Sequence, residues 1–514
     1  MGYTEYKLRM AVSEGEEGLR KAVALASGLT DFSFSIVNKS LDARKKYRIE
    51  WEYRVAVTSP ELKGGQAPLA PGLVHEQVGR GARVGVVGSG PAGIFAAAYL
   101  ARCGFKVTVF ERGGRVEDRR AAIASFEGGG GFPARSNYAF GEGGAGTFSD
   151  GKLSSRSKGI NAEQNYIVAG FISAGAPPEI AYMTHPHLGS DTLFSMTRRI
   201  RETLTEAGVE FRFDTVVKDL LVKGGRVCAL VTEEGTHDVD QAVFACGHSA
   251  YETYRMLMDR GVSFQPKNFA IGFRAEHEQR IINRAQWGQD ALAGVKAAEY
   301  RLTAGAEGGT GVYSFCMCPG GTIVPASAYP GTGIVNGKSD YARDGRWANA
   351  AVVAGLNLPA LLGREVGAKE ALDWLEALER RYYDFSGGYR APAMSVRDFL
   401  SGAAGAAPRA SSYALGLVAA DFGELLPAGL VVPLRTGLRS FCTKLRGYDE
   451  GQLLGLESKT SAPIQVLRHP ESLNSGYSNL YIAGEGSGWS GGIVSSAADG
   501  LRVAQALCRA VAGK

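Results

Sequence analysis

The chain has 514 residues and a formal charge of +5, and 70 of its residues are glycine, about twice the average share of this residue. No Gly-x-y period runs through the chain and only 19 residues are proline, so collagen and Pro/Gly-rich disorder are excluded. With 45% hydrophobic residues, the composition predicts a globular protein of two or three domains and gives no reason to expect a nucleic acid or an anionic membrane as a partner.

The first 60 residues have the pattern of a small α+β domain, for which we expect a ferredoxin-like arrangement. Apolar residues alternate in strands and recur every three to four positions in helices. By that criterion the chain begins with a strand, a helix and two strands, at residues 6–10, 18–26, 32–37 and 47–57. The basic turn at residues 42–46 would suit nucleic acid, or else a solvated hairpin or a contact to the rest of the chain. Residues 61–80 are rich in Pro, Gly and polar residues and predict a linker.

A βαβ unit follows the linker. The expected strand, helix and strand lie at residues 82–87, 94–103 and 106–110. A G-x-G-x-x-G motif, Gly88-Ser89-Gly90-Pro91-Ala92-Gly93, stands at the first strand-to-helix turn. In such a motif Gly88 permits the tight turn, Gly90 lets the backbone approach a pyrophosphate, and Gly93 lets helix and strand pack closely. The helix N-terminus then offers N–H groups and a positive dipole end to the diphosphate.

An acidic residue completes this unit. Glu111 follows the second strand, and the carboxylate that binds an adenosine ribose stands about 20 residues after the motif in proteins of this kind. The sequence therefore predicts a dinucleotide site made of Gly88, Ser89, Gly90, Pro91, Ala92, Gly93, Glu111 and Arg112.

Two later segments favour FAD over NAD. Residues 209–245 have the pattern of a β-meander that returns to the nucleotide sheet, and Ala245-Cys246-Gly247 is similar to the Ala-Thr-Gly turn of FAD-binding Rossmann proteins. Near the end of the chain, a strand at 479–483 leads to Glu485 and then to a Gly-Gly helix start. This resembles the second FAD fingerprint, in which an acid, more often Asp, holds the ribitol. These segments add Val217, Cys246, Gly247, Gly484, Glu485, Gly491, Gly492 and Ile493 to the predicted FAD site.

A glycine-rich segment at residues 141–153 supplies a third wall. Small residues let this backbone lie against a flat ring, with N–H groups facing flavin N5 or phosphate; the alternative is an unrelated flexible loop. The segment contributes Gly144, Ala145, Gly146, Thr147, Asp150, Gly151 and Lys152 to the predicted site. No second G-x-G-x-x-G follows a strand, which argues against a separate NAD(P) domain.

These blocks together resemble a family of FAD-dependent oxidoreductases of bacteria and plastids, described as FAD-dependent dehydrogenases of unknown substrate. The matching stretches are GGAGTFSDGKL at 143–153, YSFCMCPGG at 313–321, NGKSDYARDGRWAN at 336–349, ESKTSAPIQV at 457–466 and residues 481–500. The resemblance implies an α/β fold with a Rossmann-like, glutathione-reductase-type FAD-binding domain and an inserted α+β substrate domain. It implies FAD-binding segments at 81–262 and 456–514 around a substrate domain at 263–455, but no reaction.

Cys316 and Cys318 form the most reactive-looking motif of the substrate domain. Two thiols in C-x-C spacing beside a glycine-rich turn can exchange with a disulfide or pass electrons to flavin. They can equally pack as small apolar residues on one strand face. Metal binding with His185 and His187 lacks a compact four-ligand pattern, so we expect no metal. The chain has seven cysteines, which we interpret as reduced thiols.

A polar block at residues 336–344 suggests where a substrate binds. Lys or Arg can fix a carboxylate and Tyr can relay a proton, although a well-bonded loop at the domain junction would look the same. Lys459 would stabilise reduced flavin near N1 and O2, and Trp489 would wall the substrate side, unless both simply pack. The predicted substrate residues are thus Asn336, Lys338, Tyr341, Arg343 and Trp489, with Cys316, Cys318 and Lys459 as catalytic candidates. The glycine-rich loops at 128–131, 308–311 and 320–337 are further candidates for substrate contact.

The sequence thus predicts an FAD-dependent oxidoreductase that transfers hydride between flavin N5 and an unidentified small molecule, for which an anion is one option. An unidentified electron partner, with NAD(P)H as a candidate, recycles the flavin. Two alternatives stay open, an FAD-dependent flavoprotein that binds or modifies RNA and a redox-quiet FAD-binding scaffold or sensor. The start of the chain lacks an apolar signal segment, and the apolar run at 350–363 is too short to span a bilayer. We therefore expect a cytoplasmic protein without a membrane partner.

Overall fold

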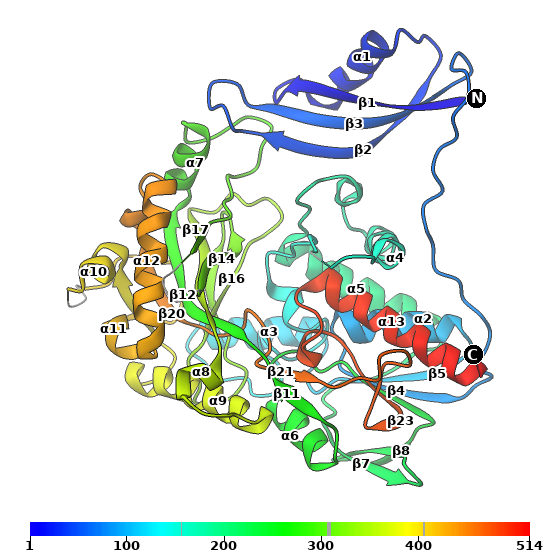
Figure 1. Ribbon diagram of the computed structural model, residues 1–514, viewed down its shortest axis with the longest axis vertical. Helices are drawn as coiled ribbons and strands as arrows, with labels where there is room; N and C mark the ends of the chain where they lie inside the picture. Colours follow the sequence, from blue (N-terminus) through cyan, green and yellow to red (C-terminus); the bar gives the residue numbers. More distant parts are fainter. Residues whose placement is uncertain (156, 306–309, 404–406, 514) are drawn as a thin grey trace.

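The computed structural model describes residues 1–155, 157–305, 310–403 and 407–513. Figure 1 shows a small unit at the N-terminus, joined by an extended segment to a larger body in which two sheets are covered by helices. No helix in the described part of the chain combines the length and the apolar character needed to cross a membrane.

The N-terminal unit is a three-stranded antiparallel sheet with one helix. Its elements are β1 (Gly2–Ala11), α1 (Gly15–Ser27), β2 (Ser33–Asp42) and β3 (Glu50–Ser59), and β3 lies between the other two strands. Val23 of α1 is buried with Val55 and Val57 of β3, so the helix covers one sheet face. The predicted order of strand, helix, strand, strand is confirmed, although most of these elements extend beyond the predicted bounds. These are the first four of the six elements of a ferredoxin-like unit.

A six-stranded Rossmann-like sheet forms the centre of the nucleotide-binding part. Its order is β22 (Asn474–Ser475), β23 (Tyr477–Ile482), β10 (Gln241–Phe244), β4 (Arg83–Val87), β5 (Lys106–Phe110) and β6 (Glu210–Arg212). All strands except β22 run parallel. The predicted return of the chain to this sheet is therefore confirmed, both at β10 and, from the last 40 residues, at β23.

Helices from opposite ends of the chain pack together on this sheet. Figure 1 shows α13 (Ile493–Ala512) beside α2 (Pro91–Arg102). The two helices lie so close that a Cβ atom at Gly500 would stand 2.1 Å from the carbonyl oxygen of Ala92. Three further helices belong to this part, α3 (Val116–Glu127), α4 (Asn161–Ser173) and α5 (Gly189–Glu206).

The predicted β-meander divides between two sheets. An antiparallel sheet of β7 (Val217–Lys223), β8 (Arg226–Thr232) and β9 (Gly235–Asp238) packs against the nucleotide-binding sheet. Strand β6, which the sequence assigned to the same meander, pairs instead in parallel with β5. The sequence missed β9 because its residues, Gly-Thr-His-Asp, lack the apolar alternation of a strand.

The third part is a seven-stranded sheet covered by helices. Its strand order is β13 (Thr303–Gly305), β14 (Gly311–Cys318), β17 (Trp347–Leu356), β12 (Phe269–Glu278), β20 (Gln452–Glu457), β18 (Ala391–Ser395) and β19 (Leu417–Ala419). The other elements are α6 (Tyr251–Asp259), α7 (Gln279–Trp287), α8 (Leu358–Leu362), α9 (Ala368–Ser386), α10 (Val396–Ser401), α11 (Phe422–Leu425), α12 (Ala428–Lys444) and the strand pairs β11 (Phe264–Pro266) with β21 (Ile464–Val466) and β15 (Thr322–Pro325) with β16 (Val335–Lys338).

This sheet contains two stretches that the sequence analysis singled out. Half of the apolar run at 350–363 belongs to the inner strand β17, whose residues are mostly buried, and α8 follows in the second half. The predicted boundary between residues 455 and 456 falls inside β20, which is buried along its whole length between β12 and β18.

Candidate functional site

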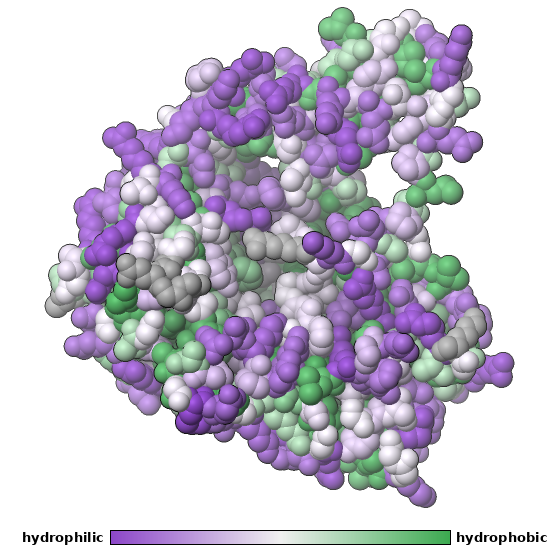
Figure 2. Space-filling model, viewed as in Figure 1, coloured by the Kyte–Doolittle hydropathy of each residue, from purple (hydrophilic) through white to green (hydrophobic). Residues whose placement is uncertain are grey.

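One large cavity lies where the three parts meet. Its volume is about 1740 Å³, whereas a pocket for one drug-sized ligand measures roughly 300–1,000 Å³. The space-filling view shows the hollow between the N-terminal unit and the body (Figure 2). Lys39 and Trp51 of the N-terminal unit line it together with residues of both large sheets. The cavity therefore has room for a dinucleotide and a second ligand.

The two helix N-termini of the nucleotide-binding part open into this cavity. Gly88, before α2, has a φ of 104°, and a Cβ atom there would lie 2.4 Å from the carbonyl oxygen of Ala245. Gly90, in contrast, lines the cavity and has only the Cα atom of Gly144 near its Cβ position, at 3.7 Å. Gly491 and Gly492, before α13, line the same space. Two helix N-termini that glycine residues leave accessible to a ligand suit the binding of the FAD diphosphate.

Glu111 ties the nucleotide-binding loops together. Its buried carboxylate accepts hydrogen bonds from the backbone N–H of Ser89 at 3.0 Å, of Gly113 at 3.0 Å and of Gly141 at 3.1 Å, and from the Ser89 hydroxyl at 2.7 Å. The carboxylate also lines the cavity. Glu111 thus holds the turn at residues 88–93 and the glycine-rich segment at residues 141–153 together, at the position predicted to bind the ribose.

A buried arginine, which the sequence analysis missed, shapes the loop at residues 141–153. Arg119 of α3 is fully buried and donates hydrogen bonds to the carbonyl oxygens of Asn137 at 2.7 Å, Glu142 at 2.8 Å and Gly144 at 2.8 Å. Because buried carbonyl groups need donors, one guanidinium holds the whole turn. The loop is therefore built as a wall of the cavity.

Most predicted cofactor residues line the cavity, and a few support it from behind. The lining residues are Gly88, Ser89, Gly90, Pro91, Ala92, Glu111, Arg112, Gly144, Ala145, Gly146, Lys152, Val217, Cys246, Gly247, Gly484, Glu485, Gly491, Gly492 and Ile493. Gly93, Thr147, Asp150 and Gly151 are not among them. Gly93 instead packs against the turn, since a Cβ atom there would lie 1.9 Å from the carbonyl oxygen of Gly88.

Asp150 is the centre of a buried ion cluster. Its carboxylate accepts hydrogen bonds from Lys152 Nζ at 2.6 Å and from Arg343 at 2.7 and 3.1 Å, and also from the hydroxyl of Ser339. Burial opposes the charge, but Lys152 and Arg343 outweigh it and hold the pKa of Asp150 well below its ordinary value. The carboxylate thereby positions two cations that both line the cavity.

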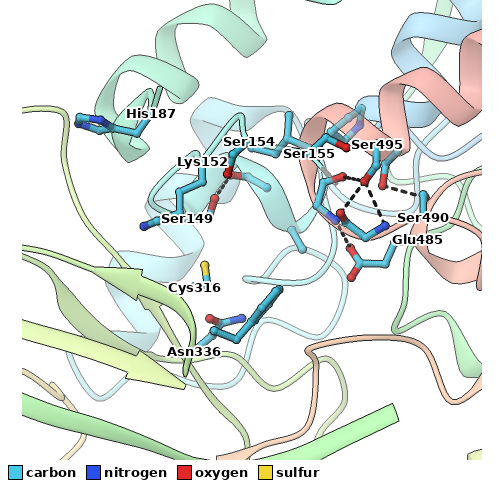
Figure 3. A pocket seen from close by; sticks show the side chains of 18 of the residues that line it. Ser149, Lys152, Ser154, Ser155, His187, Cys316, Asn336, Glu485, Ser490 and Ser495 are labelled. Carbon is cyan, nitrogen blue, oxygen red and sulfur yellow. Dashed lines mark hydrogen bonds between the residues drawn. The ribbon is translucent and has the colours of Figure 1, made fainter. Parts of the chain in front are cut away.

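Cys316 lies at the cavity wall near the expected flavin ring. Figure 3 shows its sulfur pointing into open space bordered by Lys152, Asn336 and Glu485. Cys318 is completely buried behind it. All seven cysteines are free.

Glu485 is half-buried between Cys316 and the start of α13. Burial raises the pKa of its carboxyl to about 7, against a weak opposing hydrogen bond from the Gly492 N–H at 3.5 Å. A carboxyl that titrates near neutrality can hold or release a proton beside the flavin. Its raised pKa also makes stability depend on pH, because the unfolded chain ionises at about 4.3.

We expect the Glu485→Gln variant of the FAD-free protein to be more stable than the wild type at pH 8 and nearly equal to it at pH 4. The folded state keeps Glu485 protonated up to about pH 7, so the stability of the wild type decreases as the pH rises from the unfolded pKa to the folded pKa. Glutamine does not ionise, so the stability of the variant does not change in this way. Thermal unfolding curves at several pH values measure this difference. Glu471→Gln, at an exposed position, is the control, and a pH-independent difference would contradict the expectation.

Lys459 and Trp489 contact the cavity in different ways. The ammonium of Lys459 forms a 2.7 Å ion pair with Glu379 and a hydrogen bond with the hydroxyl of Tyr251, and it is almost fully buried. The positive charge of Lys459 is therefore already balanced by the Glu379 carboxylate, independently of any contact with a flavin. Trp489 is 52% exposed, and its indole N–H donates to the carbonyl oxygen of Val466 at 2.9 Å.

The predicted polar block is only partly a cavity wall. Asn336 and Arg343 line the cavity, whereas Lys338 and Tyr341 are not among the lining residues. Lys338 donates to the hydroxyl of Tyr138 at 3.0 Å, and Tyr341 donates to Glu179 at 2.5 Å. These two side chains are thus engaged with protein partners, which the spacing of the polar residues could not show.

The substrate loops suggested by glycine content have mixed positions. Gly128–Gly131, after α3, do not line the cavity, while the loop at 320–337 contributes Asn336. Of the loop at 308–311, Gly311 lines the cavity and residues 308 and 309 lie outside the described residues.

The sequence analysis did not predict several residues of the site as ligand contacts. His187, which it considered only as a metal ligand, and Lys296 line the cavity near Tyr341, and the Lys296 ammonium lies 3.0 Å from the centre of the Tyr341 ring. His248 also lines it, and burial, with Lys459 nearby, lowers the pKa of its imidazole to about 3. Arg274 does not line the cavity but is fully buried behind it, and it does have a sequence signal, because it interrupts the apolar strand β12 and a buried charge in such a strand needs partners.

Two family models match the chain. Residues 268–460 match a model described as FAD-dependent protein, C-terminal domain-like. Residues 86–131 match a model of an NAD(P)-binding Rossmann-like domain. The second match covers the G-x-G-x-x-G unit, and the first covers the seven-stranded sheet. FAD is thus the cofactor, and the mixed α/β fold contains a Rossmann-like domain.

Individual relatives extend this comparison. An uncharacterised protein of Clostridium beijerinckii is 36% identical over 91% of this chain and 91% of its own length. A 1-hydroxycarotenoid 3,4-desaturase of a Flavobacterium species is 30% identical over 22% of each chain. The solved structure of CtdE in complex with FAD aligns with 84% of this chain and 88% of its own, with 12% identity and a TM-score of 0.37.

Proposed function

The chain belongs to a family of FAD-dependent proteins, and we propose that it is an oxidoreductase that transfers hydride between flavin N5 and a small anionic molecule bound in the cavity. FAD, when bound, supplies the two-electron chemistry. We further propose the glutathione-reductase type of Rossmann fold, with the domain of the seven-stranded sheet, β20 included, inserted between two FAD-binding segments. The observation that carries the proposal is that one cavity contains both helix N-termini that follow glycines, together with more cationic than acidic side chains.

The charge of the cavity lining supports an anionic substrate. Among the described residues that line the cavity, Lys and Arg outnumber carboxylates by eight to four. The cations are Lys39, Arg112, Lys152, Lys267, Lys296, Arg301, Arg343 and Lys459, and the carboxylates are Glu111, Glu179, Glu299 and Glu485. Such an excess of positive charge concentrates anions and binds them through charge-assisted hydrogen bonds.

The protein's own groups have separable tasks in this proposal. The glycine-rich loops bind the cofactor, and Trp489 excludes water on one side of the expected ring position. Lys152 and Arg343, held by Asp150, orient an anionic substrate toward the ring. Glu485, with its pKa of about 7, holds a proton that can accompany the hydride.

Anaerobic flavin reduction tests the proposal. The purified holoenzyme is mixed with a panel of small carboxylates and phosphate esters, and with NADH and NADPH, while the flavin absorbance is followed. We expect bleaching by at least one anionic compound, with saturation kinetics. If dithionite bleaches the flavin but no compound of the panel does, the redox-quiet scaffold becomes the better description.

Lys296→Gln is expected to raise KM for the anionic substrate about tenfold and to leave kcat nearly unchanged. One charge-assisted contact contributes roughly 1.5–3 kcal/mol, and each 1.4 kcal/mol is a factor of ten. A contact made equally in the ground state and the transition state changes KM alone. The measurement is flavin reduction against substrate concentration. Lys369→Gln, whose ammonium pairs with Asp259 outside the cavity, is the control, and an equal effect of both variants would contradict this role of Lys296.

A further inference from the structure

Cys316 occupies an unusual backbone position. Strand β14 pairs Phe315 with Ala351 and Cys318 with Asn349, so it carries one extra residue, a β-bulge, between these pairs. Within the bulge Cys316 has a φ of 43°, which is uncommon for any residue other than glycine. Strained residues of this kind persist only where neighbours hold them, and they cluster at functional sites.

Two cations hold the bulge in place. Arg274 is fully buried and donates to the Cys316 carbonyl oxygen at 2.8 Å, and it also approaches Cys318 Sγ to 3.6 Å. Its other nitrogen atoms bind Asn349 at 2.7 Å and Glu457 at 2.9 Å, which fixes the guanidinium. From the cavity side, Lys152 Nζ donates to the carbonyl oxygen of Met317. The thiols therefore lie in a rigid, electropositive setting.

The two thiols are neighbours but are not equivalent, and the Cys318 thiol donates to the Cys316 carbonyl oxygen at 3.3 Å. The neighbouring Cys318 thiol lowers the pKa of Cys316 to about 7, and Lys152 and Arg274 act in the same direction. The Cys316 thiol, together with burial, raises the pKa of Cys318. Cys316 faces the cavity while Cys318 is buried, so one thiol is available as a nucleophile and the other stands behind it as its resolving partner.

A second thiol pair in the protein gives an internal comparison. Cys103 and Cys508 are also neighbours that shift each other's pKa, but they are buried in the helical core of the nucleotide-binding part and do not line the cavity. Neither has a positive φ. Both pairs thus consist of neighbouring thiols. Only the pair of Cys316 and Cys318 lies in a strained bulge and has a member, Cys316, that lines the cavity.

We propose that Cys316 and Cys318 form a redox-active dithiol that carries electrons between the bound flavin and a small disulfide in the cavity. This inference rests on the proposed function and names the electron partner of the same site. The excess of cationic side chains in the cavity favours a disulfide that bears carboxylates. In this proposal the C-x-C motif serves electron transfer and not only packing on a strand.

The chemistry balances in two steps. The Cys316 thiolate attacks the substrate disulfide, forms a mixed disulfide and releases one thiolate, which takes up a proton. Cys318 gives up its proton and displaces the second thiolate, which is also protonated, leaving a Cys316–Cys318 disulfide and two substrate thiols. Reduced FAD, when bound, would supply the two electrons and two protons that return this internal disulfide to two thiols.

The first test measures thiols and does not depend on turnover. The folded holoenzyme, with its flavin oxidised, is incubated with oxidised glutathione and digested, and the peptides are analysed by mass spectrometry. We expect the peptide that contains Cys316 and Cys318 to lose two hydrogens, while Cys103 and Cys508 stay reduced. The Cys318→Ser variant should instead retain glutathione on Cys316. Two free thiols at positions 316 and 318 after oxidation would overturn the proposal, as would equal oxidation of both pairs.

The second test separates this proposal from the proposed function. Excess dithiothreitol is added anaerobically to the oxidised holoenzyme, and flavin bleaching is followed. We expect bleaching in the wild type and in Cys228→Ser, whose thiol lies outside the cavity, and at least a tenfold slower rate in Cys316→Ser, with dithionite reducing all three. If dithiothreitol bleaches the flavin equally in Cys316→Ser and the wild type, the dithiol proposal fails, while bleaching of both proteins by an anionic substrate leaves the oxidoreductase standing. If the disulfide forms but no compound reduces the flavin, the proposed function fails instead.

Discussion

Gly90→Val is expected to abolish FAD binding without unfolding the protein. Gly90 has φ −71° and ψ 179°, an extended conformation that valine adopts easily. Its Cβ position has only the Gly144 Cα nearby, at 3.7 Å, so the side chain enters the cavity and not the protein. There it occupies the space where the diphosphate must approach the α2 N-terminus. Loss of one charge-assisted contact costs about 1.5–3 kcal/mol, and displacement of the whole diphosphate is expected to raise Kd more than a hundredfold, or about 2.7 kcal/mol.

Flavin content and circular dichroism together measure this effect. The variant should be colourless and should keep the wild-type secondary structure. Gly72→Val is the matched control, because the linker position has nothing within 4 Å of its Cβ and does not line the cavity. A Gly90→Val protein that still binds FAD at wild-type affinity would show that the diphosphate lies elsewhere. A Gly88→Val protein offers no such test, since its Cβ would collide with Ala245 and unfold the turn.

The nucleotide-binding half could be predicted from sequence because its constraints are local. The tight turn at Gly88, the unobstructed approach of a ligand at Gly90 and the close packing of helix and strand at Gly93 each require glycine. All three requirements can be recognised within one short motif. The return of β10 and β23 to the sheet could also be predicted, since buried parallel strands appear as short apolar runs. The same logic placed Glu111 at the end of β5, where it binds the loops.

The substrate half could be predicted only in part, because its contacts join residues distant in sequence. Lys338 and Tyr341 have the polarity of ligand-binding residues, yet their partners, Tyr138 and Glu179, come from the nucleotide-binding half. Nothing in the local sequence around Lys39 shows that the N-terminal unit lines the cavity. The positive φ of Cys316 depends on the register of β14 against β17, which is a property of the pair and not of either strand.

Asp150→Asn should destabilise the substrate side of the protein by about 3–5 kcal/mol, the usual cost of removing one partner from a buried ion pair. The loss would leave Lys152 and Arg343 facing each other around a neutral amide. For a unit of this size the unfolding temperature should fall by the order of 10 °C. The exposed Asp344→Asn, in the loop that carries Arg343, is the control and should have little effect. Equal unfolding temperatures for wild type and Asp150→Asn would contradict the cluster.

The pH dependence of this difference tests its electrostatic origin. The pKa of Asp150 lies below its ordinary value in the folded protein, whereas the unfolded chain titrates near about 3.9. A lowered carboxyl pKa contributes stability that is fully present above the unfolded pKa and is lost as the pH falls toward the folded one. The gap between wild type and Asp150→Asn should therefore be constant from pH 5 to pH 7 and narrow below about pH 4. A gap that persists unchanged into acid would mean that shape and hydrogen bonding, and not charge, hold Lys152 and Arg343 in the cavity wall.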